Sequence, residues 1–395
     1  MSLPNVNIVL GNGNIGSASL SDDGIAALVL TGAEVGETLI LNTPYTLAGS
    51  ADLKKLGVTQ ENNPLIHKDV SAFYKSAGEG AELHLLVCSN ETTLTQICSA
   101  SAGSPLRTLL DSAAGRIRLV GVNRNAPKEY IPTLSGCIDA DVITATSAAQ
   151  ANALSYLGQI APFVALIPAI GWNGETASLY QPREGSYNSV SVLLASDGKF
   201  GESELYSAAI GQVLGRAAKS AVNISIARVR DGAIAATGFL TDGKTPEEHF
   251  SDRNLLHDAG FLFYRTYIGK NGYYLNDDAT AAPTTDDYNR LCLTRVIQKA
   301  VVICYKTYID EILDSLNVDA ETGKLPQPLC KAFEQYVVTG INTNMGTEIS
   351  GFTAFINPDQ DLITSGKLDV QCKIVPTALL KEIKVDLSFN NPANK

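Results

Sequence analysis

Between residues 24 and 260, short and almost uninterrupted apolar runs alternate with amphipathic stretches. Such runs are typical of strands in a parallel sheet, because helices cover both of its faces. The apolar runs predict strands at 25–30, 82–88, 117–122, 164–170 and 190–194. The amphipathic stretches predict helices at 64–77, 105–112, 145–157 and 203–218. We therefore expect an α/β body built on a largely parallel or mixed sheet.

The segment 257–316 combines a buried strand, a tight turn and a long helical pattern. The aromatic run at 261–267 lies between two glycines and predicts a covered strand. Asn271 and Gly272 then predict a hairpin-type turn, because both residue types tolerate positive φ. Strand 273–275 returns from that turn, and a polar loop follows it.

Apolar residues recur at steps of three or four from Tyr288 to Leu316, which predicts a helix buried on more than one side. Thr284 and Asp287 resemble a capping box in front of it. Four cations remain on the rest of the helix, and we expect them to face solvent or an acidic surface: Arg290, Arg295, Lys299 and Lys306. Beyond it, the pattern predicts a helix at 326–338 and a turn at 342–345.

Two blocks of this region carry a family resemblance. GFLFYRTYIGKNGYYLNDD at 260–278, followed by DDYxRLxxxRVIQKA at 286–300, resembles the Bacteroidetes-type tail-sheath-related family of contractile phage tails and injection systems. The remaining chain is compatible in layout, with an LPNVNIVL opening, an α/β middle and a strand-forming tail. The resemblance implies an α+β fold overall, with a C-terminal sheath core domain and terminal β-strand arms. It also implies a sheath of stacked rings around an inner tail tube, with baseplate and terminator proteins as further partners. In such a sheath, the basic flank of the 288–316 helix is the candidate face for the tube, through Arg290, Arg295, Lys299 and Lys306.

Both ends of the chain carry short alternating apolar patterns next to flexible, polar sequence. Such strands lack a local partner and invite pairing with another chain. Contacts of this head-to-tail kind propagate as rings or filaments. A further alternating run at 368–374 predicts a strand just before the C-terminal arm. We therefore expect exchange between subunits through Val6, Ile8, Leu10, Ile383, Val385, Leu387 and Phe389.

The length of 395 residues predicts two or three domains. We place an N-terminal arm at 1–20, an α/β body at 21–255 and the sheath core at 256–395, with a C-terminal arm at 380–395. The body forms one domain or two, and its first strand is a candidate to join the core. Only 18% of residues are charged, which suits a subunit packed among copies of itself.

The net charge of −11 argues against nucleic acid and anionic membrane as partners. Seven scattered cysteines are typical of reduced core residues in a cytoplasmic protein. No signal peptide is recognisable, and the apolar run at 160–170 is too short to cross a bilayer. We expect assembly in the cytoplasm and a final place in a virion tail or contractile particle.

Two motifs resemble nucleotide-binding loops. Residues 11–16 match G-x-G-x-x-G, but no helical pattern follows, as the dinucleotide site would require. Residues 238–245 match the whole P-loop motif, with Lys244 and Thr245 at its end. Pro246 removes a backbone donor there, and Glu247 and Glu248 put negative charge where phosphate would bind. A surface turn is therefore expected, and a P-loop NTPase remains the alternative, beside a non-contractile tube or baseplate subunit.

No catalytic or metal-binding constellation emerges. The four histidines at 67, 84, 249 and 257 lack metal-ligand spacing. The acidic pairs 277–278 and 286–287 could hold a divalent cation, but a solvated loop and a helix cap explain them better. Cys88 ends a strand without an identifiable base as partner. We expect neither an enzyme, nor a cofactor, nor a metal.

Overall fold

The computed structural model describes residues 22–390 of the chain. It divides into two compact units, one ending at Ile312 and the other beginning at Leu313. Among the described residues, no helix combines the length and apolar character needed to cross a membrane. Val6, Ile8, Leu10 and the glycine motif at 11–16 lie outside the described residues.

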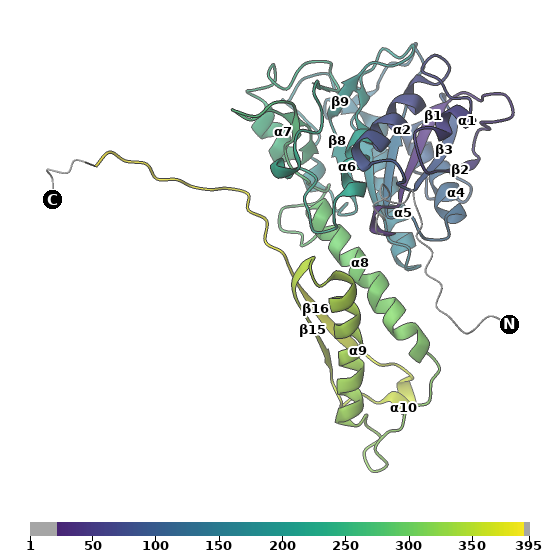
Figure 1. Cartoon of the computed structure of the whole chain (residues 1–395), viewed down its shortest axis with the longest axis vertical. Helices are drawn as coiled ribbons and strands as arrows, with labels where there is room; N and C mark the ends of the chain where they lie inside the picture. The colour runs from purple at the N-terminus through teal and green to yellow at the C-terminus, as the bar shows by residue number, and fades with distance from the viewer. Residues whose placement is uncertain (1–21, 391–395) are drawn as a thin grey trace, which may run out of the picture. The chain divides into compact units, whose positions relative to one another are not determined.

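A seven-stranded sheet forms the centre of the first unit (Figure 1). Neighbouring strands are parallel except β2, which runs antiparallel to β3 at one edge. The predicted α/β class and the mixed, largely parallel sheet are thus confirmed. In spatial order the strands are β12 (Phe261–Leu262), β8 (Val190–Leu193), β7 (Val164–Pro168), β4 (Leu119–Asn123), β1 (Ala26–Gly32), β3 (Leu83–Ser89) and β2 (Pro44–Leu47).

Helices cover both faces of this sheet (Figure 1). Strand β1 shows why its sequence is apolar throughout: Leu28 packs into one core with α2 and α6, and Val29 into another with α4 and α5. The predicted bounds of two helices are confirmed. The four helices are α2 (Pro64–Ala77), α4 (Pro105–Ser112), α5 (Ala140–Leu157) and α6 (Ile210–Lys219).

Helix α6 packs very closely on α2 because two of its residues are glycines. A Cβ atom on Gly211 would lie 2.0 Å from the carbonyl oxygen of Asp69, and one on Gly215 would lie 2.5 Å from that of Phe73. The prediction that this helix begins at 203 is wrong, since it begins at Ile210. Residues 207–208 form β10 instead, in a small sheet with β9 (Ala195–Gly198) and β11 (Phe239–Leu240).

The first unit extends through α8 (Leu291–Tyr308), beyond the predicted boundary at 255/256. The reason is that β12 joins the large sheet beside β8. The hairpin predicted after it consists of β13 (Tyr264–Arg265) and β14 (Tyr274–Leu275). The predicted capping box does not form, because α8 starts only at Leu291 and Asp286 accepts the N–H of Tyr288 instead. A 3-10 turn, η4 (Ile309–Glu311), follows α8, so the helix is shorter than predicted.

The second unit contains α9 (Gln327–Met345), β15 (Ile349–Ile356), α10 (Leu362–Ser365) and β16 (Val370–Pro376). Strand β16 was predicted from its alternation, whereas β15 was not. The turn predicted at 342–345 is wrong, because α9 continues and buries Ile341 and Met345. Shorter elements of the first unit are η1 (Asp22–Gly24), α1 (Asp52–Lys55), α3 (Leu94–Ile97), β5 (Leu134–Ser135), β6 (Ile138–Asp139), η2 (Pro182–Glu184), η3 (Val229–Asp231) and α7 (Arg253–Ala259).

Candidate assembly surface

The described part of the C-terminal arm, residues 380–390, is extended and forms neither helix nor strand. In Figure 1 it is the yellow trace that leads to the C terminus. The four apolar side chains of this arm that were predicted to be exchanged are exposed, with exposed fractions of 72% for Ile383, 76% for Val385, 94% for Leu387 and 107% for Phe389. Four alternating apolar side chains on an extended backbone leave an unburied strand face.

The second unit also holds a two-stranded ribbon with open edges. Strands β15 and β16 pair antiparallel from Ile356 and Val370 to Ile349 and Pro376. Helix α9 packs against β15, while β16 is largely exposed. Within residues 22–390 neither strand has a second neighbour, so both outer edges keep unpaired backbone groups. Such an edge can accept a strand from another chain.

Glu334 fastens the ribbon to α9. Its carboxylate accepts the backbone N–H of Ile356 at 2.9 Å, at the end of β15. The Lys331 ammonium lies 2.6 Å from the same carboxylate and holds the pKa of Glu334 below its ordinary value. Glu334 therefore fixes the ribbon to α9 at the end where Ile356 pairs with Val370, so the ribbon is already formed before another strand is added.

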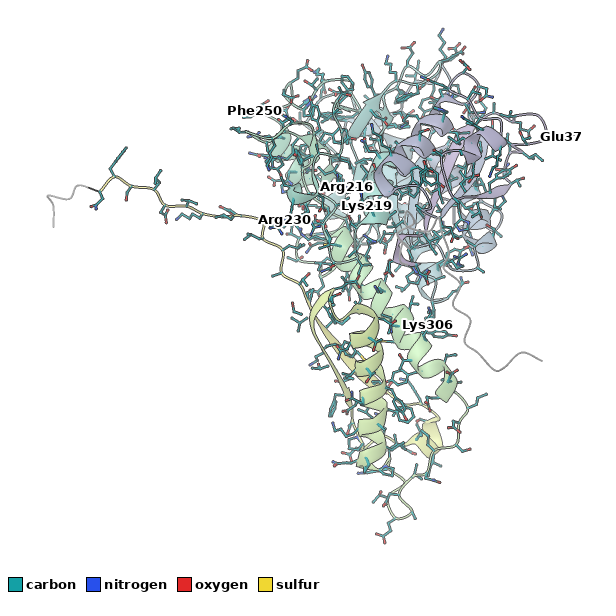
Figure 2. All side chains as sticks on the ribbon, viewed as in Figure 1. Glu37, Arg216, Lys219, Arg230, Phe250 and Lys306 are labelled. Atoms are coloured by element: carbon teal, nitrogen blue, oxygen red, sulfur yellow. The ribbon has the colours of Figure 1, made fainter. Side chains whose placement is uncertain are left out.

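The predicted basic face of α8 does not exist as one surface. Arg290 is buried and its guanidinium binds Asp277 at 2.8 Å and Asp278 at 3.0 Å. Arg295 is buried and donates to backbone carbonyls, and Lys299 pairs with Asp23 at 2.7 Å. Only Lys306 of the four predicted residues is exposed, as Figure 2 shows. The four cations were assigned to one face by sequence spacing, but the acidic groups that neutralise them come from distant segments.

The same ion pairs decide against a metal at the first acidic pair. Burial by itself would raise the pKa of Asp277, but Arg290 outweighs it and keeps that pKa below its ordinary value. Asp278 is fully buried, which raises its pKa. Arg290 thus takes the place that a cation would occupy. Residues 22–390 contain no group of three His, Cys, Asp or Glu side chains placed to hold a metal.

The P-loop-like segment at 238–245 consists of β11 and a closed turn that follows it. Glu248 accepts hydrogen bonds from the backbone N–H of Thr245 at 2.7 Å and from its hydroxyl at 2.9 Å. The carboxylate therefore sits where a phosphate would be bound. No helix begins at Lys244, whose ammonium lies 4.0 Å from Asp242. This geometry is that of the surface turn expected from the sequence.

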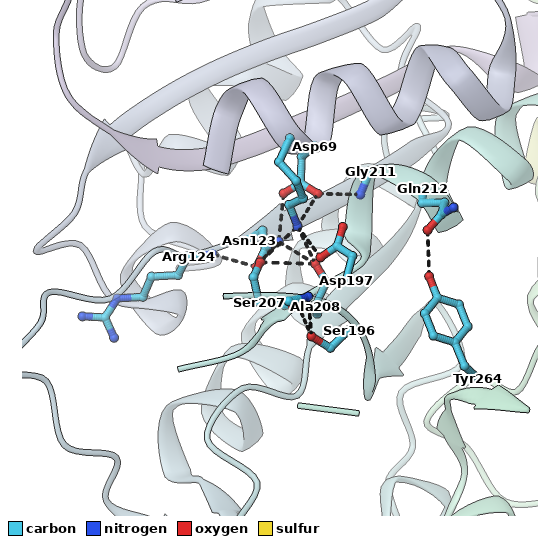
Figure 3. Close-up of polar contacts among 12 residues, drawn as sticks. Asp69, Asn123, Arg124, Ser196, Asp197, Ser207, Ala208, Gly211, Gln212 and Tyr264 are labelled. Atoms are coloured by element: carbon cyan, nitrogen blue, oxygen red, sulfur yellow. Dashed lines mark hydrogen bonds and ion pairs between the residues drawn. The ribbon is translucent and has the colours of Figure 1, made fainter. Parts of the chain in front are cut away.

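A buried polar network in the first unit escaped the sequence analysis (Figure 3). Lys68 lies 3.0 Å from both Asp69 and Asp197, and Asn123 donates to Asp69 and to Ser207. Burial raises the pKa of Asp197 to about 6, although Lys68 opposes this shift. The network joins α2, β4, β9 and β10, and its donors and acceptors are satisfied by each other, which indicates a structural role. A lysine–aspartate pair on the apolar face of 64–77 is the signal that could have revealed it.

The remaining candidates for chemistry are core residues. Burial raises the pKa of Cys88 to about 12, and its thiol donates to the carbonyl of Leu30. His84 is buried and its Nε2 lies 2.9 Å from Glu82. None of the seven cysteines, all of which lie within residues 22–390, forms a disulfide, as expected. None of these groups forms a nucleophile–base pair.

Comparisons with known proteins agree with this architecture. Residues 3–279 match the model of the DUF2586 N-terminal domain, and residues 287–394 match that of the DUF2586 C-terminal domain. A search of curated proteins finds no match.

Three solved structures resemble nearly the whole chain. The helical sheath of the anti-feeding prophage in the contracted state has a TM-score of 0.63 at 14% identity, covering 98% of this chain and 99% of that one. A chain of the anti-feeding prophage baseplate has 0.61 at 15%, covering 99% of both. The contracted PVC sheath complex of an extracellular contractile injection system has 0.59 at 13%, covering 98% of both. The chain belongs to the DUF2586 family, and its fold is that of contractile sheath proteins.

Proposed function

We propose that this chain is a structural subunit of a contractile sheath. In this function it polymerises around an inner tube and contracts to drive the tube through a target envelope. The observation that carries the proposal is the exposed apolar strand face of the C-terminal arm, in a chain whose fold matches sheath proteins from end to end. A monomer gains nothing from four apolar side chains in water, whereas a polymer can bury them.

The receiving site in this proposal is the open edge of the β15–β16 ribbon in a neighbouring copy. An added strand gains main-chain hydrogen bonds from that edge and buries its apolar face. Full burial of a side chain such as Leu387 contributes about 1.5–3 kcal/mol, from which the cost of ordering the arm is subtracted. Val6, Ile8 and Leu10 would supply a second exchanged strand from the N-terminal arm. The exchanged strands link the copies, while the tethers allow the subunits to rotate during contraction.

No nucleotide is needed in this mechanism, because the free energy of contraction is stored in the extended lattice at assembly. The chain therefore acts without catalysis or a cofactor. Its partners are other copies in stacked rings, the inner tube, and baseplate and terminator proteins, without contact to nucleic acid or membrane. Assembly takes place in the cytoplasm, and the finished particle is a virion tail or an injection device. Of the four residues predicted to face the tube, only the exposed Lys306 is still proposed to do so.

Electron microscopy of the purified chain tests the proposal. Wild-type protein should form striated tubes, and a chain lacking residues 380–395 should stay monomeric with an unchanged melting temperature. The double variant Leu387→Asp and Phe389→Asp should act like the deletion, because a buried unpaired carboxylate is costly. Replacing Ser388, which alternates with these apolar residues, by Asp serves as the matched control, and this variant should still polymerise. Tubes formed equally well by the double variant would contradict strand exchange through this arm.

A further inference from the structure

A basic groove of about 500 Å³ lies in the first unit, where α6 ends. Lys75 at the end of α2 contributes to it, as do Arg216 and Lys219 in the last turn of α6 and Arg228 in the following loop. Arg228 is neutralised by Asp231, whose carboxylate lies 2.9 Å from its Nε atom. Figure 2 shows Arg216 and Lys219 next to each other in this region.

Three of these cations form no ion pair within residues 22–390, although Asp231 also acts on Arg216 from beyond ion-pair distance. Within the described part of the chain, no carboxylate lies at ion-pair distance from Lys75, Arg216 or Lys219. Arg216 donates to the backbone carbonyls of Gly232 and Ala233 instead, at 3.2 and 3.3 Å. In a chain with a net charge of −11, three gathered positive charges predict an anionic occupant.

The lining also has an apolar part, which narrows the chemistry of the occupant. Ile224 and Ile234 line the groove and are only half-buried, and two alanines lie beside them. A small anion would leave these side chains in water. A peptide segment that carries both carboxylates and aliphatic side chains matches the whole lining.

Such a segment follows α8. Residues 309–312, named here the acidic tip, have the sequence Ile-Asp-Glu-Ile. Asp310 is exposed, Glu311 is half-buried, and the isoleucines have exposed fractions of 42% at Ile309 and 65% at Ile312. The acidic tip thus exposes both negative charge and aliphatic surface, which complement the basic and aliphatic lining of the groove.

The acidic tip is held away from the groove of its own chain. Arg295 on α8 donates to the carbonyl of Ser220 at 3.1 Å, and Ser220 lines the groove. Fourteen residues separate Arg295 from Ile309, which is about 21 Å at 1.5 Å per helical residue. We propose that the groove binds the acidic tip of a second copy of this chain. A contact between two different surfaces of identical copies propagates from copy to copy as a ring or a filament, as a sheath lattice requires.

This inference rests on the proposed sheath function and adds a second contact between copies. Its test is a fluorescently labelled peptide of residues 308–319, YIDEILDSLNVD, titrated with the full chain at a concentration where it sediments as a monomer. Wild-type protein should bind it saturably, and more weakly as salt is raised. The double variant Lys75→Glu and Lys219→Glu should weaken binding at least about tenfold, since two attractions become repulsions.

Three controls make the result specific. Lys128→Glu changes the same charge at an exposed site after the carboxyl end of β4, and should bind the peptide like wild type. A peptide with Asn and Gln in place of its acids should lose binding. Because Lys75 and Lys219 are exposed, their variants should keep the wild-type melting temperature, and glutamine at both positions should give an intermediate affinity.

Absent binding to wild type, or equal binding to the groove variant, would overturn the proposed contact. Striated tubes with such a result would leave the sheath function standing and remove the groove from it. Groove-dependent peptide binding without any tubes would support the contact and contradict the sheath function, because the contact would then serve a different assembly.

Discussion

At the scale of single residues, the buried ionisable groups have well-defined partners. His249 is buried between two acids, with Nε2 at 2.7 Å from Asp242 and Nδ1 at 3.1 Å from Asp252. Its ring also lies 4.7 Å from the ring of Trp172, measured between centroids. The hydrogen bond to Asp242 raises the pKa of His249, and burial opposes this only in part. From the sequence, the residue was only a histidine without metal-ligand spacing.

This arrangement predicts a pH-dependent contribution to stability. A histidine pKa raised by folding stabilises the fold fully below about pH 6.5, the value for the unfolded chain, and the contribution is lost as pH rises through the folded pKa. His249→Gln should therefore lower the melting temperature more at pH 6 than at pH 8.5. Melting curves of both proteins at the two pH values check this. If His249→Gln lowers the melting temperature equally at both pH values, His249 stabilises the fold only by packing on Trp172.

At the scale of elements, periodicity located most of the strands and helices. Apolar runs such as 83–88 identified strands because both faces of the sheet are covered. The ends of elements were less predictable where polar groups decide them, as at the start of α8. There Arg290 is the last extended residue, and its ion pairs with Asp277 and Asp278 hold the N-terminal end of the helix against the preceding turn.

Replacement of Arg290 by Ala should therefore destabilise the first unit severely. It removes the Arg290 cation from the buried Asp278 carboxylate and from Asp277, which keeps Arg183 at 3.8 Å. Removing one partner of a comparable buried pair costs about 3–5 kcal/mol. The free energy of unfolding in urea measures this loss. Lys306→Ala removes an exposed cation from the same helix and should change stability by no more than about 0.5 kcal/mol. A loss below about 1 kcal/mol for Arg290→Ala would mean that the pair is dispensable for holding α8.

At the scale of the whole molecule, the chain has two compact units and an arm. Residues 312–326, from the end of the first unit into the second, contain neither helix nor strand, and neither do residues 380–390 of the arm. The first unit extends beyond the boundary at 255/256 that the sequence predicted, because strand 261–262 completes the large sheet. That pairing brings together residues about 70 positions apart, which a local pattern does not reveal.

Limited trypsin digestion should report this organisation. In the monomer the first cuts should fall at Lys381 or Lys384 in the arm and at Lys324, because extended exposed backbone fits a protease site. In the polymer the arm sites should be protected by strand pairing, while their sequence is unchanged. Mass spectrometry of early fragments distinguishes the two states. Equal cleavage of the arm in monomer and polymer would speak against its burial between copies.

The sequence by itself determined most of the secondary structure of the body, its largely parallel sheet and the alternation of the C-terminal arm. These follow from local periodicity, since every second or every third to fourth residue must meet the same environment. Only the tertiary structure decided which charges remain available. Arg290, Arg295 and Lys299 bind acidic side chains or backbone carbonyls within the first unit. Lys75 and Arg216, by contrast, line one groove although 141 positions separate them in the sequence. Electrostatic pairing depends on distance in space, and no local pattern encodes it.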